Sequence, residues 1–149
     1  MRAFVWTAFV WTIRTAYCYE NLSRRPTTKL TQSSTYGSLN ADLANDGVLN
    51  TIEKYCAHTA ISHTKAWLQV DLGKMFSINN VNIFYRNEGN TGWKQYRFRQ
   101  FYLDISTLRA TETTAVQRTR CYTDNTTAPY LPSTTIDIPC KETARYIIV

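Results

Sequence analysis

The amino-acid sequence predicts an all-β domain, built as a sandwich or a barrel, on three observations. The chain has ten Tyr and is rich in Thr, and both residue types favour strands over helices. Several short segments alternate apolar and polar residues with the period of two that marks a half-buried strand. Turn signals separate these segments about every ten residues, as in sandwiches and barrels. With 149 residues and 44% hydrophobic content, the chain can bury a core of its own as one domain.

The clearest strand lies in the segment that begins at Cys56 and ends at Arg86. Leu68, Val70 and Leu72 fall on its apolar face, and Trp67, Gln69 and Asp71 fall on the opposite face, which is expected to be polar. Gly73 ends this strand, and a second alternation runs over 81–86. His58 is then expected in a loop before the first strand, and Arg86 at the end of the second. Basic side chains on loops that strands hold in place are typical of a binding module.

The remaining strands are expected at 30–37, 101–106, 136–138 and 146–149, with an edge strand at 115–118. The segment 43–50 carries Asn-Asp-Gly turn chemistry and has room for a short helical turn at its start. No internal repeat, heptad or low-complexity tract interrupts this pattern.

Charge and hydropathy exclude several classes of protein. The 17 Lys and Arg outnumber the 11 Asp and Glu, but they are scattered and follow no zinc-finger or helix-turn-helix pattern, so we expect no nucleic-acid partner. No segment approaches the roughly 18 apolar residues of a membrane span, so no membrane insertion is expected. The sequence also predicts no enzyme, because its two His come without a Ser-His-Asp set or paired carboxylates in one loop.

Residues 1–18 have the pattern of a secretory signal peptide. A positive start precedes an apolar stretch over 3–13, and small residues at the first and third positions of the Ala-Tyr-Cys triplet suit signal peptidase. We place the cleavage after Cys18, so that the mature domain spans 19–149; the alternative is a buried N-terminal strand. The expected location is extracellular, either secreted or as the ectodomain of a larger cell-surface protein. Two N-glycosylation sequons, at Asn21 and Asn125, fit this location.

Secretion changes how the cysteines are interpreted. Without Cys18 the chain keeps Cys56, Cys121 and Cys140, which is an odd number in an oxidising compartment. Two of them are expected to pair and one to be left over, unless the chain is incomplete.

A series of short motifs resembles the motifs of the fucolectins. These are the F-type lectins of the galactose-binding-like group, which also contains discoidin-type domains. The motifs are Tyr19-Glu20-Asn21-Leu22, Gln32-Ser33-Ser34-Thr35-Tyr36, Asp46-Gly47, Cys56-Ala57-His58-Thr59, Trp67-Leu68-Gln69-Val70-Asp71-Leu72-Gly73, Tyr85-Arg86, Arg97-Phe98-Arg99-Gln100-Phe101 and Arg145-Tyr146. In this order they cover nearly all of residues 19–149. The resemblance implies an eight-stranded jelly-roll β-sandwich.

The resemblance also implies a fucose-binding site, because the family holds its sugar with one His and two basic residues. His58 matches the family's His because it stands in the motif Cys-x-His-Thr. Arg86 matches the first basic residue because a Tyr precedes it, and Arg97 matches the second because an apolar residue and then a Phe follow it. The same loop contains Glu88, in the place of the family's Asp, Lys94, as the alternative to Arg97, and Trp93, which could pack against the fucose methyl group. Compared with the family, the gap between His58 and Arg86 is one residue longer, and the loop before Arg97 is four residues longer.

The chemistry of these side chains suits a sugar. Each guanidinium keeps its proton and offers forked donors to vicinal hydroxyls and a ring oxygen, and a neutral imidazole can donate to an axial hydroxyl. Each candidate also has an ordinary structural interpretation. His58 is then a surface histidine, Arg86 a solvated side chain or a partner of Glu88, Arg97 part of an exposed strand edge, and Trp93 a cap on the core.

A structural Ca²⁺ is implied as well. Its ligands would be the Asp46 carboxylate and the backbone carbonyls of Leu43 and Val48. In the alternative interpretation, Asp46 only caps a turn. The family completes the calcium shell with a Glu from a final strand that this sequence does not contain.

The resemblance further implies the disulfide Cys121–Cys140. It assigns the partner of Cys56 to the same final strand, just before the Glu that would complete the calcium shell. We therefore expect the chain to be a fragment that lacks its closing strand; if its end is real, Cys56 is a free thiol and calcium binding is crippled.

Two functions are compatible with these residues. The first is a secreted lectin whose partners are fucosylated glycans, and the second is a degenerate adhesion or receptor ectodomain module that keeps the jelly roll and binds no sugar. Because a fold does not settle a function, the lectin prediction rests on His58, Arg86 and Arg97. The sequence leaves a homo-oligomer open.

Overall fold

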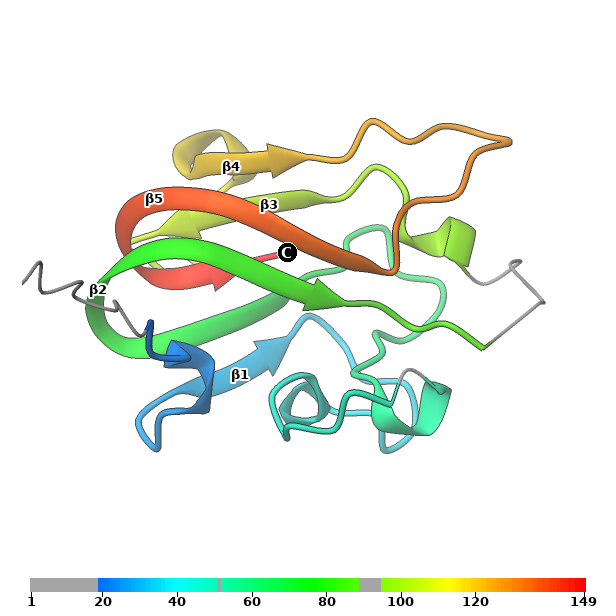
Figure 1. Cartoon of the computed structure of the whole chain (residues 1–149), viewed down its shortest axis with the longest axis horizontal. Coiled ribbons are helices and arrows are strands. Elements are labelled where there is room, and N and C mark those ends of the chain that lie inside the picture. Colours follow the sequence, from blue (N-terminus) through cyan, green and yellow to red (C-terminus); the bar gives the residue numbers. More distant parts are fainter. Residues whose placement is uncertain (1–18, 51, 89–94) are drawn as a thin grey trace, which may run out of the picture.

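The computed structural model describes residues 19–50, 52–88 and 95–149. In these residues, antiparallel strands form one sheet with the order β1-β2-β5-β3-β4 (Figure 1). The strands are β1 (Lys29–Gln32), β2 (Leu68–Phe84), β3 (Tyr102–Ser106), β4 (Thr119–Thr123) and β5 (Thr135–Ile148). Short 3-10 turns complete the described structure: η1 (Leu22–Arg24), η2 (Ala41–Ala44), η3 (Glu53–Tyr55), η4 (Gln95–Phe98) and η5 (Ala115–Gln117). The all-β prediction is confirmed, and no helix in the described ranges is long and apolar enough to cross a membrane.

The sheet folds into two layers because β2 and β5 are long and bend together (Figure 1). Residues 69–71 of β2 pair with 146–148 of β5, and after an irregularity in the register 76–84 pair with 135–144. Gly73 lies in this irregularity with a φ of +83°, a conformation that glycine adopts without strain. The last residues of β5 also pair with β3, so this part belongs to the five-stranded layer. The rest of β2 and β5 folds back over that layer, which gives a β-sandwich.

The bend corrects two sequence predictions. Gly73 was expected to end a strand, and 136–138 and 146–149 were expected to be separate strands, but β2 and β5 each continue through the turn. The physical reason is that the two strands stay paired on both sides of the irregularity, so both follow the same curve. Because each long strand serves both layers, the described residues form five strands where the resemblance implied eight.

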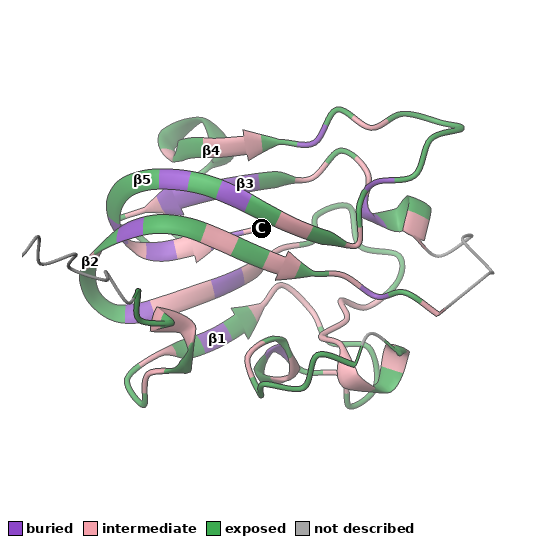
Figure 2. Cartoon of the chain, viewed as in Figure 1, coloured by how far each residue is buried: buried purple, intermediate pink, exposed green. Residues whose placement is uncertain are grey.

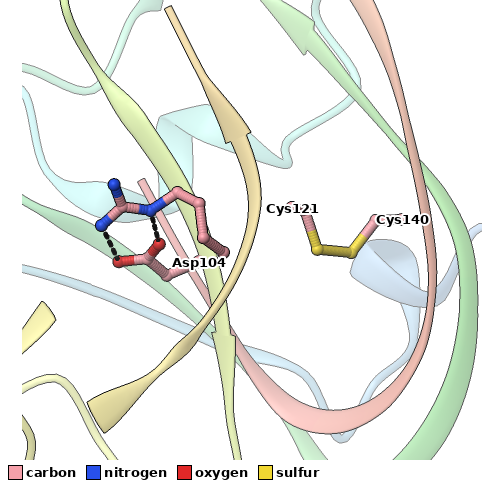
Figure 3. The surroundings of a disulfide bond; sticks show 4 residues. Asp104, Cys121 and Cys140 are labelled. Atoms are coloured by element: carbon pink, nitrogen blue, oxygen red, sulfur yellow. Dashed lines mark hydrogen bonds and ion pairs between the residues drawn. A yellow bond between two sulfur atoms is a disulfide. The ribbon is translucent and has the colours of Figure 1, made fainter. Parts of the chain in front are cut away.

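The core lies between the two layers. Its buried residues are Leu72, Ile78, Ile105, Cys140 and Ala144, each 3% exposed or less. Figure 2 shows the consequence along β5, where buried positions are interleaved with exposed ones. The implied disulfide Cys121–Cys140 is present beside this core and joins β4 to β5 (Figure 3). It ties together two strands that are not neighbours in the sheet order.

The second face of β2 is not the solvated face that the alternation predicted. Gln69 is only 5% exposed, and its side chain donates to Thr31 Oγ1 at 3.2 Å and accepts from the Ala110 backbone N–H at 2.6 Å. Ala110 belongs to the segment between β3 and β4, which covers this face together with Trp67. Asp71, on the same face, accepts two hydrogen bonds from the Arg145 guanidinium at 2.7 and 2.9 Å. Period-two patterning cannot reveal such a cover, because the covering segment is distant in sequence.

Three shorter segments were also predicted from the sequence; two of them differ in the structure and one agrees. The strand expected at 30–37 is confined to β1, and Gly37 then turns the chain with a φ of +57°. The edge strand expected at 115–118 is instead η5, whose start is fixed by a capping box between Thr114 and Gln117. The short helical turn expected near residue 43 is present as η2, capped by the Asn40 side chain.

Candidate functional site

The sequence candidates gather around the end of β2. Arg86 and Glu88 follow β2 directly, and η3 and η4 lie at the same end of the sandwich (Figure 1). The predicted signal peptide, Trp93 and Lys94 lie outside the described residues.

Arg86 is a buried cation held between two carboxylates. Its side chain is 5% exposed, which differs from the solvated interpretation of the sequence. Nη1 lies 2.9 Å from Glu53 Oε1, and Nε donates to Glu88 Oε1 at 2.8 Å. The same Glu88 oxygen accepts the backbone N–H of Glu53 at 3.1 Å, which fastens η3 to the end of β2. The sequence predicts the pairing with Glu88 as the structural alternative, and it does not predict the pairing with Glu53.

One nitrogen of this guanidinium keeps unused donor capacity. Nη2 is buried and lies 2.6 Å from Glu88 Oε1, but it forms no hydrogen bond with aligned geometry in the described residues. A buried donor without an aligned acceptor costs free energy, of the order of 1–3 kcal/mol. Functional sites are one place where such groups occur, because a ligand can satisfy them.

His58 is fixed mainly through its backbone. Its N–H donates to Leu39 O at 3.0 Å, and its carbonyl accepts from Tyr36 N at 2.9 Å. The half-buried ring lies 5.1 Å from the Tyr36 ring, and Nδ1 is 2.6 Å from Thr59 O. A carbonyl only accepts, so Nδ1 carries the proton and Nε2 of the neutral ring is an acceptor. This reverses the expectation that a neutral His58 donates to a sugar hydroxyl.

Arg97 lies on an exposed 3-10 turn and not on the strand edge that the sequence suggested. The turn η4 is anchored by an aromatic ladder, in which Phe98 stacks between Tyr85 and Phe101 with centroid distances of 4.2 and 4.1 Å. Burial raises the pKa of the Tyr85 hydroxyl, and the positive charges of Arg97 and Arg86 oppose this rise. The two arginines therefore both lie close enough to Tyr85 to act on the same hydroxyl.

Cys56 connects the His58 loop to the buried arginine. Burial raises the pKa of its thiol; the charge of Arg86 lowers it, and those of Glu88, Asp46 and Glu53 raise it further. Cys56 is a free cysteine, and its Sγ lies 3.5 Å from Ile52 O. The structure thus brings Arg86, its two carboxylates and Cys56 together. No hydrogen bond within the described ranges joins the side chains of His58 and Arg86.

The loop with the expected calcium ligands is a compact turn. Asp46 Oδ1 accepts from Val48 N at 2.7 Å, which matches the interpretation of Asp46 as a turn cap. The Arg24 guanidinium packs so closely on Gly47 that a Cβ at this position would clash with it. Calcium takes about six to eight oxygen ligands, and in the described residues no three His, Cys, Asp or Glu side chains are placed so that they could hold a metal ion together. One carboxylate and a neighbouring cation do not make that shell, and calcium binding by Asp46, Leu43 and Val48 stays a prediction.

Sequence reasoning missed Glu53 as a member of the site. Glu53 stands in a polar stretch before Cys56, and its partners Arg86 and Glu88 come more than thirty residues later. No local pattern marks such a contact. One indirect signal is its position, since Glu53 lies three residues before the Cys-x-His motif.

Comparison with known proteins places the fold in a family. The family model described as NedA-like, galactose-binding domain matches residues 43–149, so the chain belongs to this family. No curated protein matches the chain.

Solved structures show the same fold at low sequence identity. A fucolectin from striped bass (Morone saxatilis) serum superposes with a TM-score of 0.66 at 20% identity, covering 87% of this chain and 41% of that one. The lectin domain of lectinolysin, solved with the Lewis B antigen, gives 0.61 at 24% identity and covers 87% and 83%. Chitosan-binding module 1 of a Paenibacillus chitosanase/glucanase gives 0.62 at 22% identity and covers 87% and 84%. The chain spans less than half of the striped bass protein. The shared fold confirms the jelly-roll prediction.

Proposed function

We propose that this protein is a carbohydrate-binding lectin domain that recognises terminal fucose-type sugars and is not an enzyme. The observation that carries the proposal is Arg86, a guanidinium fixed by two carboxylates whose Nη2 has no aligned acceptor in the described residues. Membership of the galactose-binding family supports it, and so does the fold shared with a fucolectin and with a domain that binds Lewis B. The partners would be fucosylated glycans outside the cell.

The proposed mechanism uses donors and acceptors that are already held in place. Arg86 and Arg97 donate to sugar oxygens, and His58 Nε2 accepts from a hydroxyl. Hydrogen bonds that involve a charged group are worth about 1.5–3 kcal/mol each. Because ordering and desolvation costs offset a large part of the two charged bonds from Arg86 and Arg97 and of the neutral bond to His58, we expect a dissociation constant in the millimolar to micromolar range.

A second function is favoured by one feature of the same site. Arg86 already forms ion pairs with both Glu53 and Glu88, and its side chain is only 5% exposed. A purely structural ion-pair cluster would have this form, and the protein would then be an adhesion or receptor module without a sugar site. The fold cannot decide the sugar class either, since a chitosan-binding module shares it.

Retention on fucose-agarose tests the proposal. Wild type should be retained, and Arg86→Ala should flow through, because it removes the fixed donors. The control is Arg25→Ala, which removes a half-buried arginine that pairs with Glu20 and lies over the Phe76 ring, and it should keep retention. Circular dichroism checks that each variant is folded. A folded wild type that passes straight through would favour the non-binding module.

The same column tests the predicted calcium. If Asp46 contributes to a structural Ca²⁺, EDTA should lower both retention and the melting temperature of wild type, and Asp46→Ala should no longer respond to EDTA. If EDTA changes neither quantity, the turn-cap interpretation of Asp46 holds.

The proposed extracellular location has its own test. Expression in a eukaryotic secretory system should release a protein whose N-terminal sequencing begins at Tyr19. An intracellular product that still begins at Met1 would contradict both the signal peptide and the location.

A further inference from the structure

A second group of exposed side chains lies next to the candidate site and has no role in it so far. Tyr96 on η4 is 43% exposed, and the loop between β4 and β5 carries Tyr130, which is 73% exposed, and Leu131, which is 45% exposed. Single exposed apolar side chains are ordinary, whereas a contiguous group of them marks an interaction surface. Whether these side chains form one surface depends on how the two segments are held together.

Two hydrogen bonds hold this loop against η4. Gln95 Nε2, at the start of η4, donates to Pro132 O at 2.8 Å, and Arg99 Nη2, directly after η4, donates to Pro129 O at 3.4 Å. Figure 1 shows the loop and η4 at the same end of the sandwich. The two exposed residues of the loop lie between these anchor points, so this part of the loop is fixed beside the turn.

Tyr96 and Arg99 lie on one side of the η4 turn. Side chains three residues apart lie above one another in a 3-10 turn, and the Arg99 guanidinium is 5.9 Å from the centre of the Tyr96 ring. The turn and the loop therefore form one surface, the η4 face, which consists of Tyr96, Arg99, Tyr130 and Leu131.

The η4 face is continuous with the candidate sugar site. Arg97, a predicted sugar ligand, follows Tyr96 directly on the same turn. Tyr85, the residue before Arg86, stacks on Phe98 of this turn with ring centroids 4.2 Å apart. A ligand larger than one sugar ring that is bound at Arg86 could therefore reach the η4 face.

Arg99 keeps donors for such a ligand. Arg86 and Arg120 pair with carboxylates, but Arg99 forms no ion pair in the described residues. Its hydrogen bond to Pro129 O is long, and its Nε is buried without an acceptor in the same part of the chain. Because a guanidinium carries five N–H donors, most of the donors of Arg99 are not used by the described protein atoms.

The η4 face offers the groups that bind a saccharide. A pyranose ring carries hydroxyls at its edge and C–H groups on its faces. A tyrosine has a flat apolar ring for the C–H groups and a hydroxyl for hydrogen bonds, and it loses little conformational entropy when it is fixed. Arg99 can donate to sugar oxygens. An entirely apolar partner would cover Arg99 without satisfying its donors, which is unfavourable.

We propose that Tyr96, Arg99 and Tyr130 form a second saccharide subsite, which binds the sugar residue next to the terminal fucose of a fucosylated oligosaccharide. The inference rests on the proposed function, because the fucose at Arg86 places the next residue. The subsite makes the protein selective for oligosaccharides over free fucose, since two linked contacts act on one ligand.

Isothermal titration with two probes, methyl α-fucoside and the Lewis B oligosaccharide, tests the subsite. We expect wild type to bind the oligosaccharide about tenfold or more tightly than the fucoside. Tyr130→Ala and Arg99→Gln should each remove most of this preference and should leave the fucoside affinity within about twofold of wild type. The matched control Tyr19→Ala removes a tyrosine that is 69% exposed near η1, and it should change neither affinity.

The fucoside affinity of each variant also shows whether its fold and its first site are intact. Wild type that binds both probes equally would overturn the subsite while the lectin function stands. The same holds if Tyr130→Ala and Arg99→Gln keep the wild-type preference for the oligosaccharide. Loss of both affinities in variants that are folded by circular dichroism would overturn the subsite as a separate one. Wild type that binds neither probe would overturn the lectin function together with the inference.

Discussion

Two arginine–carboxylate clusters in this molecule use the same chemistry in opposite ways. In the sheet, the buried group is an anion, since Asp104 on β3 is 3% exposed and pairs with Arg120 on β4 (Figure 3). At the end of β2, the buried group is a cation, Arg86, between two anions. One cluster joins neighbouring strands, and the other joins a strand end to the turn η3.

The cluster in the sheet is closed. Arg118 contributes a second charge 4.0 Å from Asp104, and its other nitrogens donate to Ala110 O and to Thr113. The Arg120 guanidinium lies 3.7 Å from the centre of the Tyr102 ring. Its arginines thus have protein partners on several sides, whereas Nη2 of Arg86 has no aligned acceptor in the described residues.

The difference between the two clusters indicates how a structural ion pair can be told apart from a candidate binding site. Burial and charge pairing alone do not separate them, because both clusters have these properties. Solvent exposure does not separate them either, because each cluster has one partly exposed partner, Arg120 in the sheet and Glu53 at the end of β2. The distinguishing feature is the buried Nη2 of Arg86, which has no aligned acceptor in the described residues. If this is correct, changes in the closed cluster should affect stability, and changes in the open cluster should affect sugar affinity.

The largest effect is expected in the closed cluster. Asp104→Ala leaves two arginines without their buried counter-charge, and breaking a buried pair in this way costs about 3–5 kcal/mol. Urea denaturation should show this loss in the free energy of unfolding. The control Asp137→Ala changes an exposed carboxylate on β5 and should stay within about 0.5 kcal/mol of wild type. A loss below 1 kcal/mol for Asp104→Ala would mean that the closed cluster does not stabilise the fold.

The disulfide beside the closed cluster should come next. Replacing both Cys121 and Cys140 by Ala removes a link with a sequence separation of 19, and such a link stabilises by about 3 kcal/mol. The melting temperature should fall, while sugar affinity of the folded protein at low temperature should not change. Cys56→Ala, which removes a free thiol, is the control for the loss of sulfur in the melting temperature only, because Cys56 lies at the candidate site. A loss of affinity in the double variant would link the two regions and contradict their separation.

Arg86→Lys should reverse the pattern. Lysine keeps the charge between Glu53 and Glu88 but lacks the planar fork, so the free energy of unfolding should fall by only about 1–2 kcal/mol. Fucoside affinity should fall about tenfold or more, because the directed donors are lost. Arg25→Lys is the matched control at an exposed ion pair. Unchanged affinity in Arg86→Lys would show that a positive charge is sufficient for fucoside binding and that the geometry of the arginine donors does not contribute to it.

The smallest effect is expected from an ion pair outside both clusters. The hydrogen bond from Arg145 lowers the pKa of Asp71 from its ordinary value of 3.8, with help from the Gly73 N–H. The pKa of Asp71 is lower in the folded state than its ordinary value of 3.8. The ion pair therefore contributes its full stabilisation above the ordinary value, and this stabilisation is lost as the pH falls through the folded pKa. Arg145→Gln should therefore be less stable than wild type at neutral pH, and the two melting temperatures should converge in acid. A difference that is constant from neutral pH to acid would exclude this pair as the cause.

The fold could be predicted where contacts follow a local pattern. The alternation of Leu68, Val70 and Leu72 placed Leu72 on the apolar face of its strand, and Leu72 is fully buried. The continuity of β2 across Gly73 could not be predicted, because it depends on pairing with β5 more than sixty residues later. The same limit hid the burial of Gln69 by Ala110.

The candidate site could be predicted only in part for the same reason. Motif position identified Arg86 and Glu88, and the structure joins them. The role of Glu53 and the proton on His58 Nδ1 depend on contacts that a motif does not encode. Tertiary contacts, and not residue identity, decide which donors and acceptors stay available to a ligand.

The position of β5 in the sheet has a consequence for how the chain folds during synthesis. β5 lies between β2 and β3, so the two hydrogen-bonded strand pairs β1–β2 and β3–β4 have no link within the sheet until β5 is made. Until then, the inner edges of β2 and β3 are unpaired and can associate with other chains. Contacts between distant segments also form slowly, because they close long loops. We therefore expect the described strands to form one sheet only after β5 pairs with both β2 and β3, and we expect a ribosome-bound chain stalled before residue 135 to be sensitive to proteases.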